Sequence, residues 1–309
     1  MKKNNLKPKA LSTGRVLKIT FVLIIAFIIM GTSIFYKAND SIFKLSDNLI
    51  SQVASAHTNE LSQLLDSIIV ETSFLANLDS VRSGDWNLMR TELSNYMKAK
   101  SDVFEMFFYV DKNGDYQTTS GVFENVREEG YFNQIMNQGK DIVIENVVAS
   151  RTSYEPTFII ANAVKDKSGK TMGVLGSTIL LNQLSNLVQS INIGYGMLID
   201  GTGLITATKD GRFALKFNIS QTNEIGLEIS SNLLNFIKMN YFGNEIIRDH
   251  EGKNQIAYYQ PVKGSPNWSL IILVPQDQMM APAIDLIKIV VLVMIIILLI
   301  TIIILIKIF

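Results

Sequence analysis

The sequence predicts an α+β protein with a long N-terminal helix and two antiparallel-sheet modules in tandem, flanked by two transmembrane helices. Three observations predict it. Apolar runs long enough to cross a bilayer stand at both ends of the 309 residues. An amphipathic helical stripe follows the first run, and later segments alternate with period two between glycine-containing turns. Helices followed by a meander of strands form an α+β plan.

Two apolar runs raise the hydrophobic content of the chain to 48%. Residues 17–36 carry one charge, Lys18, and a helix of that length rises about 30 Å, the thickness of a bilayer core. Residues 286–308 are apolar except for Lys288 and Lys307, which stand near the two ends where long side chains reach the headgroups. We therefore expect two helices that span the plasma membrane and contact its lipid bilayer.

Charge at the N-terminus predicts the orientation. Residues 1–16 are expected in the cytoplasm and residues 37–285 outside, because every charged residue that precedes or borders the first span is basic: Lys2, Lys3, Lys7, Lys9, Arg15 and Lys18. Without these six, 22 basic residues face 28 acidic ones, which does not favour nucleic acid as a partner. A cleaved signal peptide is the alternative, but Tyr36 stands where a cleavage site needs small residues.

Periodicity predicts the elements between the spans. An apolar stripe from Ile42 to Ile69 predicts one long helix, either capped at residues 39–41 or continuous with the first span. Further helices are expected over residues 86–98, 131–137, 181–191 and 232–241. Strands are expected over residues 103–110, 141–148, 157–164, 171–180, 195–200, 204–208, 255–261 and 268–274.

Few residue patterns point to chemistry. The chain has no cysteine, and His57 and His250 stand far apart without neighbouring ligands, so we expect no metal, no cofactor and no enzyme. Residues Asp111 to Asp115 superficially resemble a calcium loop, but the glycine and glutamate spacing of such a loop is missing. They therefore predict a hairpin turn. Residues 248–251 predict a solvated turn. The glycines of GVLG, residues 173–176, predict close packing within a sheet.

Four stretches of the sequence form a specific combination. They are VFEMFFYVDKNGDY, the segment from EGYF to GSTI, GYGMLIDGTGLITAT and YYQPVKGSPNWSLIILVPQDQMMAP. They resemble successive strands and turns of the double Cache sensor domain, the extracytoplasmic module of many bacterial methyl-accepting chemotaxis proteins and related receptors. The resemblance covers residues 37–285. It implies two PAS-like modules, a membrane-distal one at about residues 80–180 and a membrane-proximal one at about residues 190–278, with the long helix alongside both.

The resemblance also implies a ligand pocket against the distal sheet. Its lining would come from residues near the Tyr-Phe pair, from the loop before the P-x-x-x-I-A strand and from the end of the GVLG strand. Together with the aromatic residues of this region, the candidate ligand-binding residues are Tyr109, Arg127, Glu129, Tyr131, Phe132, Ser150, Tyr154 and Thr178. Ordinary core or surface packing is the alternative role for the aromatic ones.

The candidate pocket departs from the family pattern for amino acids. That pattern places a basic residue two positions before the aromatic pair, for the ligand carboxylate, and an acid after GVxG, for the ammonium. Glu129 and Thr178 stand at these positions here, and Arg127 is two residues out of register. We expect no carboxylate clamp, because a buried Glu129 would repel a ligand carboxylate. If Glu129 points inward, it favours a cationic or hydrogen-bond-donating ligand.

The expected function is extracytoplasmic small-molecule sensing by a transmembrane receptor, of the chemoreceptor type, acting as a homodimer along the helix of residues 42–69. Alternatives are the sensor portion of a histidine kinase or cyclic-nucleotide enzyme, a membrane-anchored scaffold, and an anchored enzyme that would need a catalytic set. The sequence ends two residues after Lys307, so the signalling domain of family members is expected to be absent. The receptor would then be a fragment or would signal through another membrane protein.

Overall fold

The computed structural model describes residues 13–150, 153–210, 213–221, 224, 226–249 and 251–308. His250 therefore lies outside the described residues. The chain divides into two compact units, one made of residues 1–49 with 276–309 and the other of residues 50–275. The second unit contains both sheets. Its helices and those of the first unit are α1 (Thr13–Ala76), α2 (Asp79–Arg82), α3 (Trp86–Ala99), α4 (Gly130–Met136), α5 (Asn182–Gln189), α7 (Ser231–Lys238) and α8 (Gln276–Ile308).

Two helices are long and apolar enough to cross a membrane. The candidate spans are Thr20–Ala76, which forms the main part of α1, and Gln276–Ile304, which forms the main part of α8. Of the two arrangements that the sequence left open, the continuous one is correct, because α1 runs without a break from Thr13 to Ala76. Its apolar N-terminal portion exposes side chains such as Phe21, Ile28 and Ile29 at about 60%.

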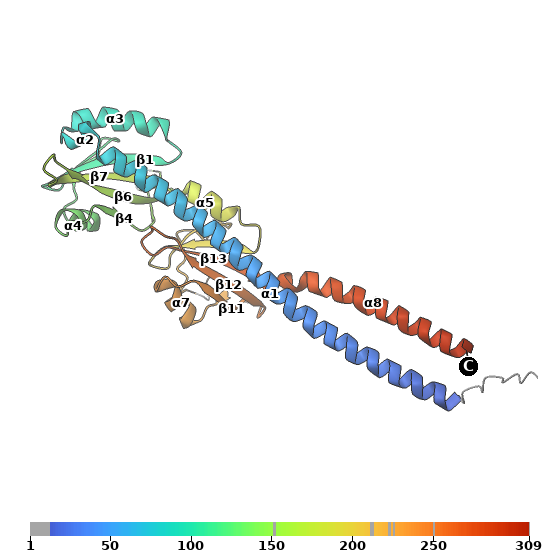
Figure 1. Cartoon of the computed structure of the whole chain (residues 1–309). Helices are drawn as coiled ribbons and strands as arrows, with labels where there is room; N and C mark the ends of the chain where they lie inside the picture. Colours follow the sequence, from blue (N-terminus) through green and yellow to red (C-terminus); the bar gives the residue numbers. More distant parts are fainter. Residues whose placement is uncertain are drawn as a thin grey trace, which may run out of the picture. The chain divides into compact units, whose positions relative to one another are not determined.

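The first sheet is antiparallel throughout. Its strands run in the order β3-β2-β1-β7-β6-β4, and β5 also pairs with β6. They are β1 (Phe104–Asp111), β2 (Asp115–Thr118), β3 (Phe123–Asn125), β4 (Ile142–Ile144), β5 (Val148–Ala149), β6 (Pro156–Lys165) and β7 (Thr171–Leu180). Helices α2 and α3 pack on one face and α4 packs on the other, so both faces of the central strands are buried (Figure 1).

The second sheet has the same plan with one strand fewer. Its order is β10-β11-β12-β13-β8-β9, again antiparallel. The strands are β8 (Tyr195–Ile199), β9 (Ile205–Thr208), β10 (Leu227–Glu228), β11 (Gly243–Asp249), β12 (Asn254–Pro261) and β13 (Ser269–Pro275). α5 packs on β8 and β9, and α7 covers a core that includes Leu233 and Ile237. Two unequal sheets preceded by helices confirm the predicted α+β fold.

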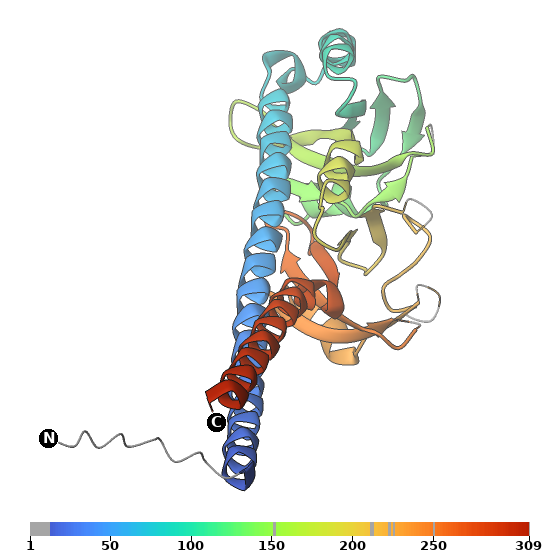
Figure 2. The same cartoon turned by 90° about the vertical axis from the view of Figure 1, so that its right-hand side faces the viewer.

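One segment of α1 joins the two sheets. From Ile50 to Ala76 the helix runs alongside both, as Figures 1 and 2 show. Its apolar side buries Leu61, Leu65 and Ile68, each at most 4% exposed. Polar side chains fix the helix along its length. Ser55, Ser62 and Ser73 form hydrogen bonds of 2.9–3.0 Å with Gln260, the backbone N–H of Lys263 and Asn162.

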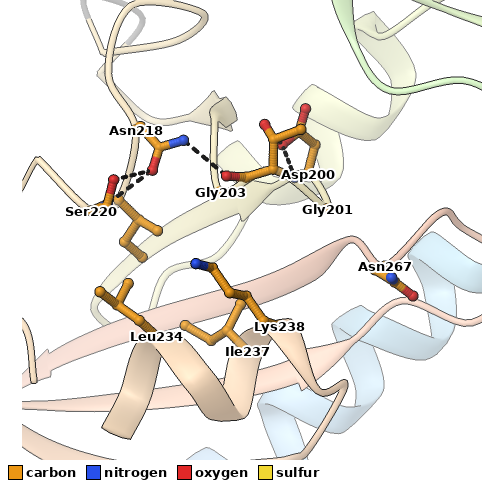
Figure 3. Close-up of a pocket in the computed structure, with 11 residues that line it drawn as sticks. Asp200, Gly201, Gly203, Asn218, Ser220, Leu234, Ile237, Lys238 and Asn267 are labelled. Carbon is orange, nitrogen blue, oxygen red and sulfur yellow. Dashed lines mark hydrogen bonds between the residues drawn. The ribbon is translucent and has the colours of Figure 1, made fainter. Parts of the chain in front are cut away.

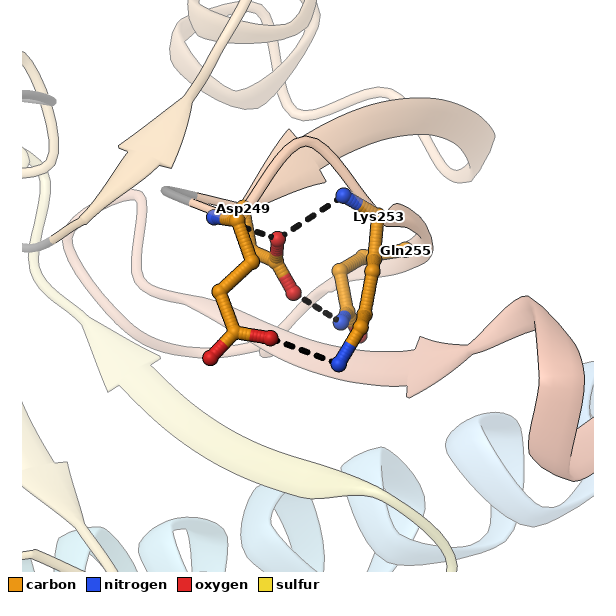
Figure 4. A network of polar contacts seen from close by, with 4 residues as sticks. Asp249, Lys253 and Gln255 are labelled. Carbon is orange, nitrogen blue, oxygen red and sulfur yellow. Dashed lines mark hydrogen bonds and ion pairs between the residues drawn. The ribbon is translucent and has the colours of Figure 1, made fainter.

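Four hairpins share one turn chemistry. In each, an aspartate at the end of a strand accepts hydrogen bonds of 2.8–3.0 Å from the backbone N–H groups two and four residues later. A glycine at the third following position has φ between +75° and +89°, which other residues adopt only with strain. Figure 4 shows the turn at Asp249, and the others begin at Asp111, Asp166 and Asp200.

The structure corrects two sequence predictions. Residues 248–251 were expected to form a solvated turn, but Arg248 lies within β11 and the turn begins one residue later, at Asp249. The expected strand over residues 141–148 is divided, since β4 ends at Ile144 and β5 begins at Val148. The three residues between them leave the regular ladder, although the N–H of Glu145 still donates to the carbonyl of Ile159.

The GVLG glycines allow close packing, as their strand context predicted. Gly176 pairs with Phe108 of β1, and a Cβ atom at Gly176 would lie 1.9 Å from Cζ of the Phe108 ring. A Cβ atom at Gly173 would lie 2.5 Å from the Tyr109 hydroxyl oxygen. Each ring thus lies over a neighbouring strand where only a glycine leaves room for it.

We predict that Gly176→Ala lowers the free energy of unfolding by about 2–3 kcal/mol, because the methyl group and the Phe108 ring compete for the same space. Denaturant unfolding of the full chain in detergent measures the loss. Gly130→Ala is the matched control, since its added Cβ would meet its nearest atom at an ordinary 3.4 Å. The double variant Gly176→Ala, Phe108→Leu should regain part of the lost stability. Equal stability of Gly176→Ala and the unmodified protein would contradict this packing argument.

Candidate functional site

A cavity of about 410 Å³ lies at the first sheet, in the size range of small-molecule sites. Strands β1, β2, β3, β6 and β7 contribute to its lining, as do the start of α4 and the segment between β4 and β6. The interruption of the strand at residues 145–147 is what brings Glu145 and Asn146 to this lining. Two of the lining residues are therefore placed by a break that the sequence did not predict.

Three aromatic rings form one wall of the cavity. The Phe108 ring centroid lies 4.9 Å from that of Tyr116 and 5.7 Å from that of Tyr131. All three residues line the cavity, and Phe108 and Tyr131 also belong to the core beneath α4. Their positions follow from packing, because Gly176 admits the Phe108 ring and the first turn of α4 presents Tyr131 to it.

The charged side chains that line the cavity are all acidic. They are Glu105, Glu124, Glu129 and Glu145, and no Lys, Arg or His stands among the lining residues that the structure describes. Ser150 donates a hydrogen bond of 2.7 Å to Oε1 of Glu105. The cavity is therefore suited to positive charge and to hydrogen-bond donors.

Glu145 has the most perturbed environment of these acids. Its Oε1 atom is buried and has no hydrogen-bond partner among the described residues. Burial raises the pKa of the Glu145 carboxyl above its ordinary value, and the negative charge of Glu129 raises it further. Both effects destabilise the ionised form of Glu145 as long as the cavity contains no positive group.

The eight candidate residues divide into two sets of four. Glu129, Tyr131, Ser150 and Thr178 line the cavity together. Phe132 lies in the core beneath α4, 3% exposed. It follows Tyr131 on α4, and consecutive helical residues point in different directions.

The other three candidates lie away from this cavity. Tyr109 follows Phe108 on β1 and therefore points to the opposite face, where burial, with a contribution from Asp111, raises the pKa of its hydroxyl to about 12. Arg127 is exposed beside the β1–β2 turn, with its backbone against Gly114. Tyr154 is 81% exposed and borders a different hollow.

Sequence reasoning missed several lining residues. Glu105, Tyr116, Glu124, Glu145 and Asn146 were not among the candidates, although all line the cavity. Glu105 lies on the predicted strand of residues 103–110, so its position was a usable signal, whereas no strand was predicted at Tyr116. Glu145 and Asn146 gave no signal, because residues 141–148 had the pattern of a continuous strand.

Two other hollows are less suited to a ligand. The pocket in Figure 3, lined by Asp200, Asn218 and Lys238 among others, has about 10 Å³ of free space, enough for about one water molecule. Its Asp200 carboxylate is already used by the hairpin turn. An open hollow of about 640 Å³ lies beside Tyr154, α5 and β9. Among the described residues, no group of three or more potential ligands could hold a metal ion.

Comparison with known proteins identifies the family. A family model described as a Cache domain, of the double Cache type, matches residues 38–283. The chain therefore belongs to the Cache domain family. It is a sensor domain of the kind found in chemoreceptors and histidine kinases, together with two apolar helices that flank it.

Solved structures show the same fold at low sequence identity. The ligand-binding domain of the Pseudomonas fluorescens chemoreceptor CtaA in complex with L-isoleucine is 17% identical, with a TM-score of 0.62, over 79% of this chain and 98% of that one. The ligand-binding domain of the Pseudomonas aeruginosa amino acid chemoreceptor PctB in complex with L-Arg is 18% identical, with a TM-score of 0.58, over 75% and 96%. The extracellular domain of the putative histidine kinase mmHK1S-Z2 is 14% identical, with a TM-score of 0.62, over 76% and 99%.

We predict that Glu145→Gln raises the melting temperature of the ligand-free full chain by about 2 °C at pH 7–8. The raised pKa means that the folded state binds protons more tightly than the unfolded state. The loss of folding stability caused by the ionised Glu145 carboxylate is therefore absent below the ordinary glutamate pKa. This loss grows as the pH rises through the folded-state pKa. The two proteins should accordingly melt at the same temperature near pH 4.

Thermal unfolding of both proteins between pH 4 and pH 8 measures this difference. Glu228→Gln, at an exposed position of β10, is the control and should leave the melting temperature unchanged across the range. A Glu145→Gln variant that is less stable than the unmodified protein at pH 8 would show that the carboxylate has a stabilising partner.

Proposed function

We propose that this protein is the sensing part of a transmembrane receptor, of the chemoreceptor type, and that a small molecule binds the cavity at the first sheet. The observation that carries the proposal is the cavity itself. It combines about 410 Å³ of space, an aromatic wall and a few polar groups, which is the usual composition of a ligand site. Related domains bind small molecules, as the structures with L-isoleucine and L-Arg record.

The proposed receptor sits in the plasma membrane with its N-terminus in the cytoplasm and residues 37–285 outside. The apolar portions of α1 and α8 support two spans, and the basic residues before the first support this orientation. The first sheet would form the membrane-distal module and the second the proximal one. β13 continues directly into α8, so a displacement of that strand acts on the second span.

One contact links the cavity to β13. The indole N–H of Trp268 donates a hydrogen bond of 3.3 Å to Oδ1 of Asn146, whose side chain lines the cavity. Trp268 is fully buried and immediately precedes β13. We propose that a ligand against Asn146 changes this contact and thereby shifts β13 and α8. A ligand drives such a shift only through its different affinities for the two states.

We predict that a binding compound stabilises the full chain against thermal unfolding, and that Thr178→Phe abolishes this stabilisation. A ligand at about 100 times its dissociation constant adds about 2.7 kcal/mol. Thr178 lines the cavity, so the larger side chain occupies the ligand's space. The measurement is a thermal-shift screen of the chain in lipid nanodiscs against amino acids, amines, organic acids and nucleobases.

Ser185→Phe is the matched control for this screen, because Ser185 borders the open hollow instead. It should keep the ligand response of the unmodified protein. If Thr178→Phe melts abnormally without ligand, Val148→Trp fills the same cavity from another side, since Val148 lines this cavity and not the open hollow. Compounds that stabilise both cavity-filled variants as well as the unmodified protein would place the binding site elsewhere and refute the proposal.

The receptor is proposed to act as a parallel homodimer along α1. The stripe of residues 42–69 that suggested this interface is partly buried against the protein's own sheets, at Leu61, Leu65 and Ile68. The opposite, exposed side of the helix remains available. It presents Ala56, Gln63 and Val70 at intervals of seven residues, the repeat of a two-helix seam.

We predict that Gln63→Cys forms a disulfide-linked dimer in oxidised membranes, since the two copies of residue 63 would face each other across the seam. The chain has no native cysteine, so the introduced thiol is unique. Non-reducing electrophoresis measures the product. Asn235→Cys, exposed on α7, is the control and should stay monomeric while reacting with a membrane-impermeant maleimide from outside the cell. A Gln63→Cys chain that remains monomeric would contradict the proposed interface. An Asn235→Cys chain that the reagent does not reach would contradict the proposed orientation.

A further inference from the structure

We infer that the cavity selects a protonated organic amine that carries no carboxylate group. This inference rests on the proposed function, because it names the ligand class of the same cavity. It departs from the amino acids that are bound in the CtaA and PctB structures. Three features of the cavity carry it: its acids, its aromatic wall and one buried oxygen atom.

The acids define the sign of the ligand's charge. Glu129 and Glu145 line the cavity and interact closely enough that Glu129 raises the pKa of Glu145. Glu105 lines the same cavity and receives the Ser150 hydroxyl, a neutral donor that leaves the negative charge in place. A positive group between these acids relieves their mutual repulsion, whereas a ligand carboxylate adds to it.

The buried oxygen atom distinguishes between kinds of cation. Oε1 of Glu145 is shielded from solvent and has no donor among the described residues. A buried acceptor without a donor is costly, and an N–H group of a ligand would satisfy it. A primary ammonium group provides such donors. A quaternary ammonium group has the charge but no N–H, so it leaves Oε1 unsatisfied.

The aromatic wall defines the rest of the ligand. Phe108, Tyr116 and Tyr131 offer a continuous surface of rings within the cavity, with Met106 and Ile159 beside them. Such a surface binds an apolar body, and ring faces also attract a nearby cation. The ligand is therefore an amine with a hydrocarbon or aromatic portion.

Among the lining residues that the structure describes, no basic partner for a carboxylate is present. Arg127 is exposed beside the β1–β2 turn. Arg151 follows Ser150 in the sequence and lies outside the described residues. A variant at Arg151 therefore belongs in the test, because an amino acid ligand would need a cation that an amine does not need.

The test uses four amino acids, each paired with its decarboxylated amine, and the full chain in lipid nanodiscs. The pairs are phenylalanine with phenethylamine, tyrosine with tyramine, leucine with isopentylamine, and ornithine with 1,4-diaminobutane. Isothermal titration calorimetry measures each dissociation constant. We expect at least one amine to bind at least tenfold more tightly than its amino acid. The N,N,N-trimethyl derivative of that amine should bind at least tenfold more weakly than the amine itself.

Variants locate the interaction. Glu145→Gln should weaken amine binding at least tenfold, and Glu129→Gln provides an independent test if the first variant does not fold. Glu155→Gln, beside the open hollow, is the matched control and should bind as the unmodified protein does. Arg151→Ala should bind the amine at least as tightly as the unmodified protein.

The outcomes separate this inference from the proposed function. Amino acid binding that equals or exceeds amine binding, or amine binding that survives Glu145→Gln and Glu129→Gln, overturns the inference. So does a chain that binds none of the four amines. If another compound class still binds in a manner abolished by Thr178→Phe, the cavity remains a sensor site of a different specificity. If no compound depends on the cavity, the proposed function fails together with the inference.

Discussion

The hairpin between β12 and β13 is the constraint on which the arrangement of the sensor domain depends. Trp268, fully buried at its end, packs edge-to-face on Phe158 of the first sheet with ring centroids 5.1 Å apart. The same hairpin donates its Lys263 N–H to Ser62 of α1, and its Gly264 lies against Asp66 of that helix. The two sheets and the long helix thus meet at one short segment. A displacement of one sheet against the other therefore has to move a closely packed indole ring.

Two polar residues of the cavity depend on a second local feature, the break between β4 and β5. A continuous strand would direct alternate side chains to the two faces of the sheet and complete the ladder with β6. The break instead places Glu145 and Asn146 at the cavity, and Asn146 accepts the hydrogen bond of the Trp268 indole. The candidate site and the contact between the sheets therefore share one irregular segment. If the cavity binds a ligand as proposed, a change at Asn146 reaches Trp268, next to β13, through a single hydrogen bond.

The strongly patterned elements were predictable from sequence, whereas registers and breaks were not. The α1 helix, both central hairpins and the Asp-x-x-Gly turns have clear local signals. β11 was missed because only Ile247 of its seven residues is buried, so the strand has little apolar alternation and forms through its ladder with β12. Tyr109 was a candidate, but its neighbour Phe108 lines the cavity, because successive strand residues point to opposite faces and the sequence does not tell which face of β1 bears the cavity.

Several buried polar atoms of the first sheet and its loops have no hydrogen-bond partner among the described residues, and Oε1 of Glu145 is the one that lies at the cavity. A domain that needed only a stable sheet would gain by replacing Glu145, whose buried oxygen has no described donor and whose charge is opposed by Glu129. Buried acids with raised pKa values concentrate at functional sites, where a ligand supplies the missing interaction. The same carboxylate that weakens the empty domain would then strengthen the occupied one. A receptor needs such a difference, because a ligand shifts an equilibrium only by the free energy with which it distinguishes the two states.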